Sequence, residues 1–225
     1  MAALEPLGAS RSQATALYSV HTPGSWRLRD GTDIVIRPIG RHDDAIELAF
    51  IRGLSRQTGY NRLLGARKLS AWEIRRLTRI DYDREMALIA ITGSGPQTRL
   101  LGDARYVRDA AAGGGAEFAI VVADAWQRKG VGTLLLQALL RHAHSAGIGN
   151  LHGITLATNY AMQNLGRKLG FAQSPDPLDA TVRHLAANAS LGILAGAVSA
   201  HAGSSAAAAA NDACIAPRAT PQAAE

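Results

Sequence analysis

The stretch AEFAIVVADAWQRKGVGT, residues 116–133, decides how the rest of the chain is interpreted. Its first half alternates between two faces and is rich in β-branched side chains, which is typical of a strand. Its second half is a turn followed by the glycine-containing segment 127–132. The leucine-rich run 134–140 that comes next predicts a largely apolar, buried helix. The sequence therefore predicts a strand, a glycine loop and a helix in direct succession.

The loop at 127–132 has the physical features of an anion-binding site. The first N–H groups of a helix have no partner within the helix, and the helix dipole is positive at that end. Gly130 and Gly132 lack side chains that would keep a phosphate away from those amides, and Arg128 and Lys129 add positive charge. The spacing Q-x-x-G-x-G differs from a Walker loop and from a dinucleotide fingerprint. We therefore expect an anionic ligand here.

The spacing Q-x-x-G-x-G, placed after an apolar strand and before a long helix, resembles the acetyl-CoA pyrophosphate loop of the GNAT N-acetyltransferases. Further segments resemble the same family and, within it, the bacterial protein-lysine acetyltransferases of the Pat type. These segments are IRPI at 36–39 with DD at 43–44, GLS at 53–55 with Tyr60 and Arg62, DYDREMAL at 81–88, NYAM at 159–162 and KLGF at 168–171. Together they extend the resemblance over roughly residues 31–187.

The resemblance implies a GNAT fold, which is an α/β (α+β) architecture with one mainly antiparallel sheet flanked by helices. It implies acetyl-CoA as the co-substrate, and we expect no metal ion. The residues that it assigns to acetyl-CoA binding are Val121, Val122, Gln127, Arg128, Lys129, Gly130, Val131, Gly132, Thr133 and Asn159. At a predicted helix start, Asn159 is equally typical of an ordinary N-cap, and both roles can hold together.

Transfer of an acetyl group to an amine needs a base, because an ammonium with a pKa of ~10.4 is not nucleophilic until it loses a proton. Glu117 is the candidate, since it lies in an otherwise apolar strand and matches the base position of the Pat type. We expect it to be partly buried, which disfavours a charged carboxylate and suits a base that works near pH 7. The alternative is a solvent-facing glutamate at a strand start. Many GNAT enzymes also carry a tyrosine that protonates the leaving thiolate, but the aligned residue here is Gly166, so no general acid is predicted at that position.

Length, charge and cysteine content limit the other functional classes. The 225 residues allow one domain with tails or two small domains, and the net charge of +6 comes mainly from arginine. No basic run with interleaved aromatic residues is present, so we expect no nucleic-acid partner. The single Cys214 excludes an internal disulfide. We expect a cytoplasmic protein without a membrane partner, because the sequence shows neither a signal peptide nor the ~20 apolar residues of a membrane span.

Composition predicts three segments. Residues 1–30 read as a mostly disordered leader, 31–187 as the acetyltransferase domain, and 188–225 as an alanine-rich low-complexity tail. Segment 55–69 is expected to be a loop or short helical turns. The predicted strands of the domain are 34–39, 86–91, 99–107, 116–122, 151–157 and 180–186, and the other predicted helices are 41–54, 160–169 and a capped helix that starts after Ser70 and runs to about 80.

The acceptor is left open by the sequence. The first hypothesis is direct transfer of acetyl to a lysine of an acceptor protein. The alternatives are acetylation of a small amine or an N-terminus, and a non-catalytic module that binds acetyl-CoA and regulates a partner. The intact Q-x-x-G-x-G together with Glu117 argues against the module, because a sensor has no need of a base. The oligomeric state is not indicated by the sequence.

Overall fold

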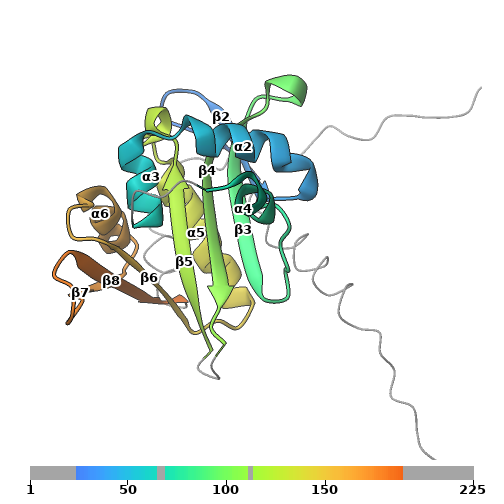
Figure 1. The fold of residues 1–225 in the computed structure, drawn as a ribbon. Coiled ribbons are helices and arrows are strands. Elements are labelled where there is room, and N and C mark those ends of the chain that lie inside the picture. The colour runs from blue at the N-terminus through green and yellow to red at the C-terminus, as the bar shows by residue number, and fades with distance from the viewer. Residues whose placement is uncertain (1–23, 65–68, 111–113, 190–225) are drawn as a thin grey trace, which may run out of the picture.

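The computed structural model describes residues 24–64, 69–110 and 114–189, which form one mixed sheet covered by helices (Figure 1). The strands are β1 (Ser25–Arg27), β2 (Asp33–Pro38), β3 (Glu85–Thr92), β4 (Arg99–Arg108), β5 (Gly115–Val122), β6 (Asn150–Leu156), β7 (Ala172–Pro175) and β8 (Val182–Asn188). The helices are α2 (Asp44–Gly53), α3 (Arg56–Leu63), α4 (Ala71–Arg76), α5 (Val131–Ser145) and α6 (Tyr160–Lys168), with the 3-10 turns η1 (Arg41–Asp43), η2 (Gly95–Gln97) and η3 (Asp124–Trp126).

The sheet is antiparallel except at one place. The described strands follow the order β1-β2-β3-β4-β5-β6-β8-β7. The pair β5–β6 is parallel, and the other described pairs are antiparallel. The helix α5 makes the crossover that a parallel pair requires. This topology confirms the expected α/β (α+β) fold with a mainly antiparallel sheet.

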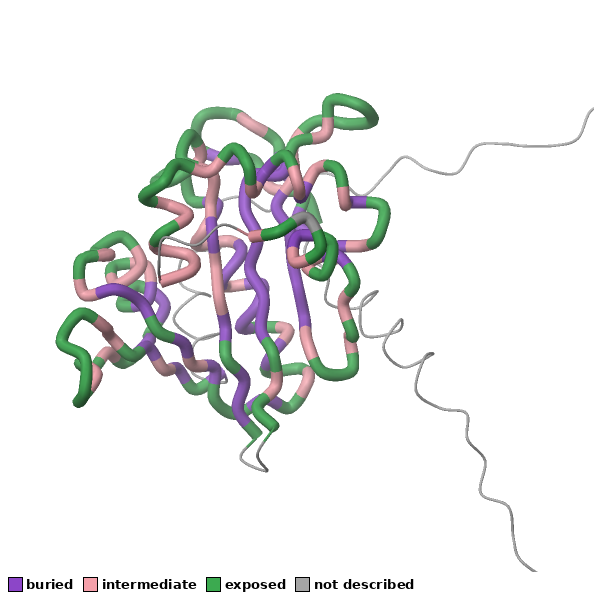
Figure 2. Tube along the Cα trace, in the orientation of Figure 1, coloured by how far each residue is buried: buried purple, intermediate pink, exposed green. Residues whose placement is uncertain are grey.

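Helices cover both faces of the sheet. In the view of Figure 1, α5 lies behind the sheet, and α2, α3 and α4 lie in front of it. The larger core lies between α5 and the sheet and includes Leu135 and Leu139. A smaller core, which includes Phe50 and Ile89, lies on the face toward α2. Figure 2 shows the buried residues concentrated along the central strands.

Local sequence signals predicted most element starts, and differences appear where the signal was weak. Ser70 and Glu73 form the predicted capping box of α4, although that helix ends at Arg76 and not near residue 80. The segment 55–69, expected to be a loop or short turns, contains the regular helix α3 with Ser55 as its N-cap. Helix α3 contains few apolar residues, so hydrophobic periodicity gave little indication of it.

Two observed strands extend across predicted boundaries. The expected leader 1–30 contains β1, which pairs with β2, and β8 extends to Asn188 beyond the expected end at 186. The short strand β7 was not expected. Strands of three or four residues are too short to display alternation, so only their pairing partners reveal them. Residues 1–23 and 190–225 of the predicted leader and tail lie outside the described residues.

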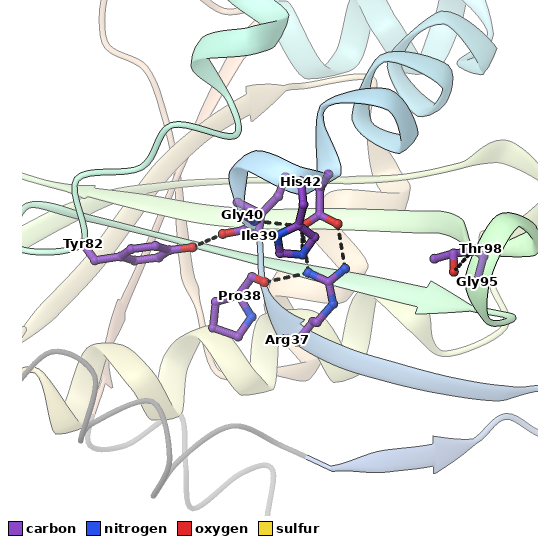
Figure 3. Close-up of polar contacts among 9 residues, drawn as sticks. Arg37, Pro38, Ile39, Gly40, His42, Tyr82, Gly95 and Thr98 are labelled. Carbon is purple, nitrogen blue, oxygen red and sulfur yellow. Dashed lines mark hydrogen bonds and ion pairs between the residues drawn. The ribbon is translucent and has the colours of Figure 1, made fainter.

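The turn between β2 and α2 is fixed by a charged pair (Figure 3). The Arg37 guanidinium donates to both carboxylate oxygens of Asp43 at 2.7 Å and to the carbonyl oxygen of Pro38 at 3.0 Å. The same carboxylate accepts from the Gly40 N–H at 2.8 Å. Nearby, the Tyr82 hydroxyl donates to the Ile39 carbonyl. These contacts hold the start of α2 against the sheet.

Candidate active site

Strands β5 and β6 form a wedge that is closed at their first residues. The pairs that they form within the described residues are Gly115–Asn150, Ala116–Leu151 and Glu117–His152. Beyond Glu117, β5 continues to Val122 with no further pair to β6 among the described residues. Apart from the Val122 carbonyl, which accepts from Gln127, backbone N–H and C=O groups on that edge of β5 are therefore available to an extended ligand, which would satisfy them as a strand does.

At the open end of the wedge, the predicted glycine loop leads into α5. Gly130 is the N-cap residue, has a φ of +100° and supplies no side-chain cap. A Cβ atom on Gly130 would meet nothing within 4 Å. The first backbone bond of the helix runs from the Leu134 N–H to the Gly130 carbonyl. The N–H groups of Val131, Gly132 and Thr133 thus remain for an anion at the positive end of the helix, which fits a pyrophosphate.

The side chain of Gln127 holds the loop itself in place. Its Nε2 donates to the Val122 carbonyl and to Thr58 Oγ1, both at 3.1 Å. The Asp124 carboxylate accepts from the Ser55 N–H at 3.0 Å and from Thr58 Oγ1 at 2.7 Å. Burial alone raises the pKa of Asp124, but the hydrogen bonds from Ser55 hold it below its ordinary value. The loop is therefore tied to the start of α3, and this contact was not predicted.

Lys129 is held at the loop by two contacts. Its Nζ lies 3.1 Å from Asp30 Oδ2 and 4.7 Å from the centroid of the Trp126 ring. Asp30 lies between β1 and β2, so this ion pair connects the glycine loop to the start of the sheet. Arg128 is exposed and has a φ of +61°. The structure thus brings both predicted cations to the loop, where Asp30 competes with any bound anion for Lys129.

The remaining residues assigned to acetyl-CoA binding lie at the end of β5, at the start of α5 and just before α6. Val121 packs toward α2, and Val122 packs toward α5. A Cβ atom on Gly132 would lie 3.5 Å from Val122 Cγ2, which is ordinary van der Waals contact, so Gly132 stands directly beside β5. Asn159 Oδ1 accepts from the Met162 N–H at 3.2 Å, which confirms its N-cap role at α6. Its contact with the ligand stays a prediction.

Glu117 stands at the closed end of the wedge, but the expected partial burial is wrong. Its side chain is exposed, and its partner on β4, Val107, is 48% exposed. The smaller core, around Phe50 on α2 and Val121 on β5, lies further along the sheet on this face. The carboxylate is therefore open to solvent, and an acceptor amine can reach it.

A buried group of charged residues beside Glu117 was missed by the sequence analysis. Arg105 Nε donates to Asp103 at 3.0 Å, and Arg105 Nη2 lies 3.9 Å from Glu47 Oε1 on α2. Burial raises the pKa of Glu47 to about 8, and the Asp103 carboxylate adds to this. Burial lowers the pKa of Arg62 on α3, against the effect of the Asp103, Glu47 and Glu117 carboxylates. The alternation of Asp103 and Arg105 in an otherwise apolar strand was the available signal.

The packing around Gly166 explains why no tyrosine stands at this position. Gly166 is buried on α6. A Cβ atom there would lie 3.2 Å from Leu185 Cδ2 and 3.5 Å from Phe171 Cβ. A larger side chain would therefore have to displace Leu185 on β8.

Residues 24–64, 69–110 and 114–189 contain neither a candidate metal centre nor a candidate membrane-spanning helix. No group of three or more His, Cys, Asp or Glu side chains in these ranges could hold a metal ion. Over the same ranges, no helix combines the length and the apolar character that crossing a bilayer demands.

Comparison with known proteins agrees with this geometry. The family model described as the acetyltransferase (GNAT) domain matches residues 33–172. The acetyltransferase PA5475 of Pseudomonas aeruginosa is 34% identical over 175 residues, which cover 77% of this chain and 92% of that protein. The acetyltransferase Pat of Mycolicibacterium smegmatis is 29% identical over 150 residues, 66% of this chain, and this match spans only 44% of Pat.

A solved structure shows the same fold. The GNAT domain of S. lividans PAT superposes with a TM-score of 0.67 at 26% identity, covering 75% of this chain and 98% of that domain. The matched range contains the glycine loop, the wedge and Glu117. The chain therefore belongs to the GNAT acetyltransferase family.

Proposed function

We propose that this acetyltransferase transfers acetyl from acetyl-CoA to the side-chain amine of a protein lysine, with Glu117 as the general base. The observation that carries the proposal is the position of Glu117 at the last pair between β5 and β6. The strands separate there, and the uncapped start of α5 lies at the other end of the wedge. A ligand whose phosphates bind at α5 and whose arm follows β5 would bring its far end to Glu117.

Each part of the chain then has a defined task. Acetyl-CoA supplies the acetyl group as an activated thioester. The amides of Val131, Gly132 and Thr133 bind the pyrophosphate, and the free edge of β5 aligns the arm. Glu117 accepts a proton from the acceptor ammonium, and the neutral amine becomes the nucleophile. Its exposure allows the acceptor to approach from solvent.

A protein lysine is favoured as the acceptor by two observations. Segments that resemble the Pat type lie in α3, which contacts β5, and around β3, which is separated from β5 by β4, and the Pat relatives match over most of the described chain. Tyr60 and Trp72, on α3 and α4, are 42% and 69% exposed. Exposed aromatic side chains are typical of surfaces that contact another protein.

The test of the base is Glu117→Gln. The amide is nearly isosteric, so the fold and the acetyl-CoA affinity should persist, while turnover should fall by roughly 10²–10⁴, as for loss of a general base. The loss should shrink as the pH rises, because more of the acceptor amine is then already neutral. Thiol release from acetyl-CoA measures turnover, and calorimetry measures affinity. Glu85→Gln, at a carboxylate that pairs with Arg76 at 3.5 Å, serves as the control.

The outcomes separate the base from the acceptor. Near wild-type turnover of Glu117→Gln at pH 7 would exclude it as the base, and loss of acetyl-CoA binding would show a structural role instead. Acceptor class is tested by comparing lysine peptides, peptides with a free N-terminus as the sole amine, and polyamines. Acetylation restricted to polyamines would reject the protein-lysine assignment in favour of the small-amine alternative, and acetylation restricted to N-termini would do so in favour of the N-terminal alternative.

A further inference from the structure

Asp109 and His152 form a polar pair beside Glu117. His152 Nε2 lies 3.1 Å from each carboxylate oxygen of Asp109. Because a carboxylate only accepts, the neutral imidazole carries its proton on Nε2 and keeps a lone pair on Nδ1. The His152 and Asp109 side chains are 38% and 34% exposed, so both are in contact with solvent. The pair is thus a carboxylate-oriented imidazole with one basic nitrogen.

The pair spans three strands through a gap left by a glycine. Asp109 follows β4, His152 lies on β6, and β5 runs between them. Beside Asp109, β5 carries Gly115, two residues before the partner of His152, and a Cβ atom on Gly115 would clash with Asp109 Oδ2. The Asp109 N–H also donates to the Gly115 carbonyl at 3.0 Å. The missing side chain of Gly115 therefore makes room for Asp109 to reach His152.

The His152 and Glu117 side chains project from adjacent positions on the same face of the sheet. They are Cα partners in the parallel β5–β6 pair, and neighbouring strands lie about 4.8 Å apart. The preceding pair, Ala116 and Leu151, is buried in the core toward α5. Since side chains alternate along a strand, Glu117 and His152 both project to the opposite face, where Glu117 is exposed.

The other titratable and charged groups near His152 have partners of their own. On β8, its partner is the uncharged Ala186. Two residues away on β8, His184 Nε2 is paired with Asp176 Oδ2 at 2.6 Å. Arg108 of β4 donates to the Ala146 carbonyl after α5 at 2.8 Å. The carboxylates next to His152 are therefore those of Asp109, just after β4, and Glu117, on β5.

We infer that, while a bound acceptor covers the Glu117 carboxylate, His152, oriented by Asp109, takes the proton from Glu117 and passes it to solvent after each acetyl transfer. This inference rests on the proposed role of Glu117. The ammonium N–H bond breaks as a Glu117 O–H bond forms. The Glu117 O–H bond then breaks as an N–H bond forms at His152 Nδ1, which gives an imidazolium beside the Asp109 carboxylate. Solvent water or buffer removes that proton, and both residues return to their starting states.

The experiment replaces His152 by alanine. His152→Ala should lower kcat at least about tenfold, a part of the 10²–10⁴ that general base catalysis contributes, with little change in KM for acetyl-CoA. Imidazole added to the buffer should restore part of the lost turnover, which a purely structural histidine would not permit. The matched control is His184→Ala, which removes another imidazole–carboxylate pair of the sheet and should change neither turnover nor its response to imidazole.

A second variant covers the case in which His152→Ala fails to fold. Gly115→Ala retains both residues but displaces the Asp109 carboxylate from His152, and it should lower kcat with a melting temperature close to the wild-type value, because only the end of a flexible side chain has to move. Unchanged turnover in both variants would overturn the inference. So would a loss in His152→Ala that imidazole does not restore, because the pair would then only hold the β4–β5 connection.

A double variant separates this inference from the function on which it rests. If His152 acts through Glu117, then Glu117→Gln with His152→Ala should be no slower than Glu117→Gln alone. Losses that multiply would overturn the relay while leaving Glu117 as the base. Full turnover in Glu117→Gln would instead reject the proposed base, and with it the relay, whatever His152→Ala shows.

Discussion

Replacing Arg37 by methionine should destabilise the fold by about 2–4 kcal/mol, because it leaves the Asp43 carboxylate buried without its cation. The guanidinium binds both carboxylate oxygens at 2.7 Å, and the Arg37 and Asp43 side chains are 27% and 3% exposed. Breaking a fully buried pair costs about 3–5 kcal/mol. We expect less here, because the 2.8 Å bond from the Gly40 N–H remains and part of Arg37 is already in water.

The loss should depend on pH in a defined direction. Burial by itself raises the pKa of Asp43, but hydrogen bonds from Arg37 and Gly40 hold it below the ordinary value of 3.8. A carboxyl group with a depressed pKa stabilises the fold when the pH is above the group's ordinary pKa. That stabilisation is lost as the pH falls through the folded-state pKa. The difference between wild type and Arg37→Met should therefore be largest near neutral pH and should shrink below pH 3.8.

Urea unfolding at pH 7 and in acid measures both effects. The matched control is Arg27→Met, because Arg27 and Asp33 make the same two-bond contact at 2.8 and 2.9 Å but are 71% and 65% exposed. Its loss should be clearly smaller. Adding Asp43→Asn to Arg37→Met should restore part of the stability. A pH-independent loss, or one equal to that of Arg27→Met, would refute the reasoning.

Two further predictions concern the loop and the buried acid. Gly130→Asp should abolish acetyl-CoA binding in calorimetry, because it places a negative charge at the start of α5. The control is Gly147→Asp, which imposes similar backbone strain because Gly147 has a φ of +74° and Gly130 a φ of +100°, and which should retain binding. Glu47→Gln should remove a pH dependence of stability, because a pKa raised from 4.5 to about 8 makes wild-type stability fall as the pH rises across that interval. Melting curves of Glu47→Gln and wild type should diverge from pH 5 to pH 9 in favour of the variant, and parallel curves would contradict this.

The local parts of this fold could be predicted from the sequence because their causes are local. Alternation in 116–122 marks β5, and the apolar run after residue 133 marks α5. The capping box of Ser70 and Glu73 depends on four consecutive residues. Gly130 at the start of α5 follows from the requirement for a positive φ and an open amide end. Such features need no knowledge of distant contacts.

The strand limits at the edges of the sheet needed the tertiary structure. The three residues of β1 carry no periodic signal, and β1 is recognisable only because it pairs with β2. The same holds for β7 against β8. Helix α3 depends on the Ser55 cap and on bonds to Asp124, which is distant in sequence. For β1 and β7 the energy of strand pairing, and for α3 the energy of helix packing, exceeds the weak local preference of the segment.

The candidate functional residues came from both levels. The sequence by itself predicted the loop at 127–133, because strand, loop and helix follow one another there, and it proposed Glu117 from its place in an apolar strand and from the resemblance to the Pat type. Only the tertiary structure showed that Glu117 is exposed and that Asp109 reaches His152 across Gly115. Burial and side-chain neighbours depend on which strands lie side by side. For residues 43 positions apart, such as Asp109 and His152, that is set by the packing of the whole sheet and not by any local pattern.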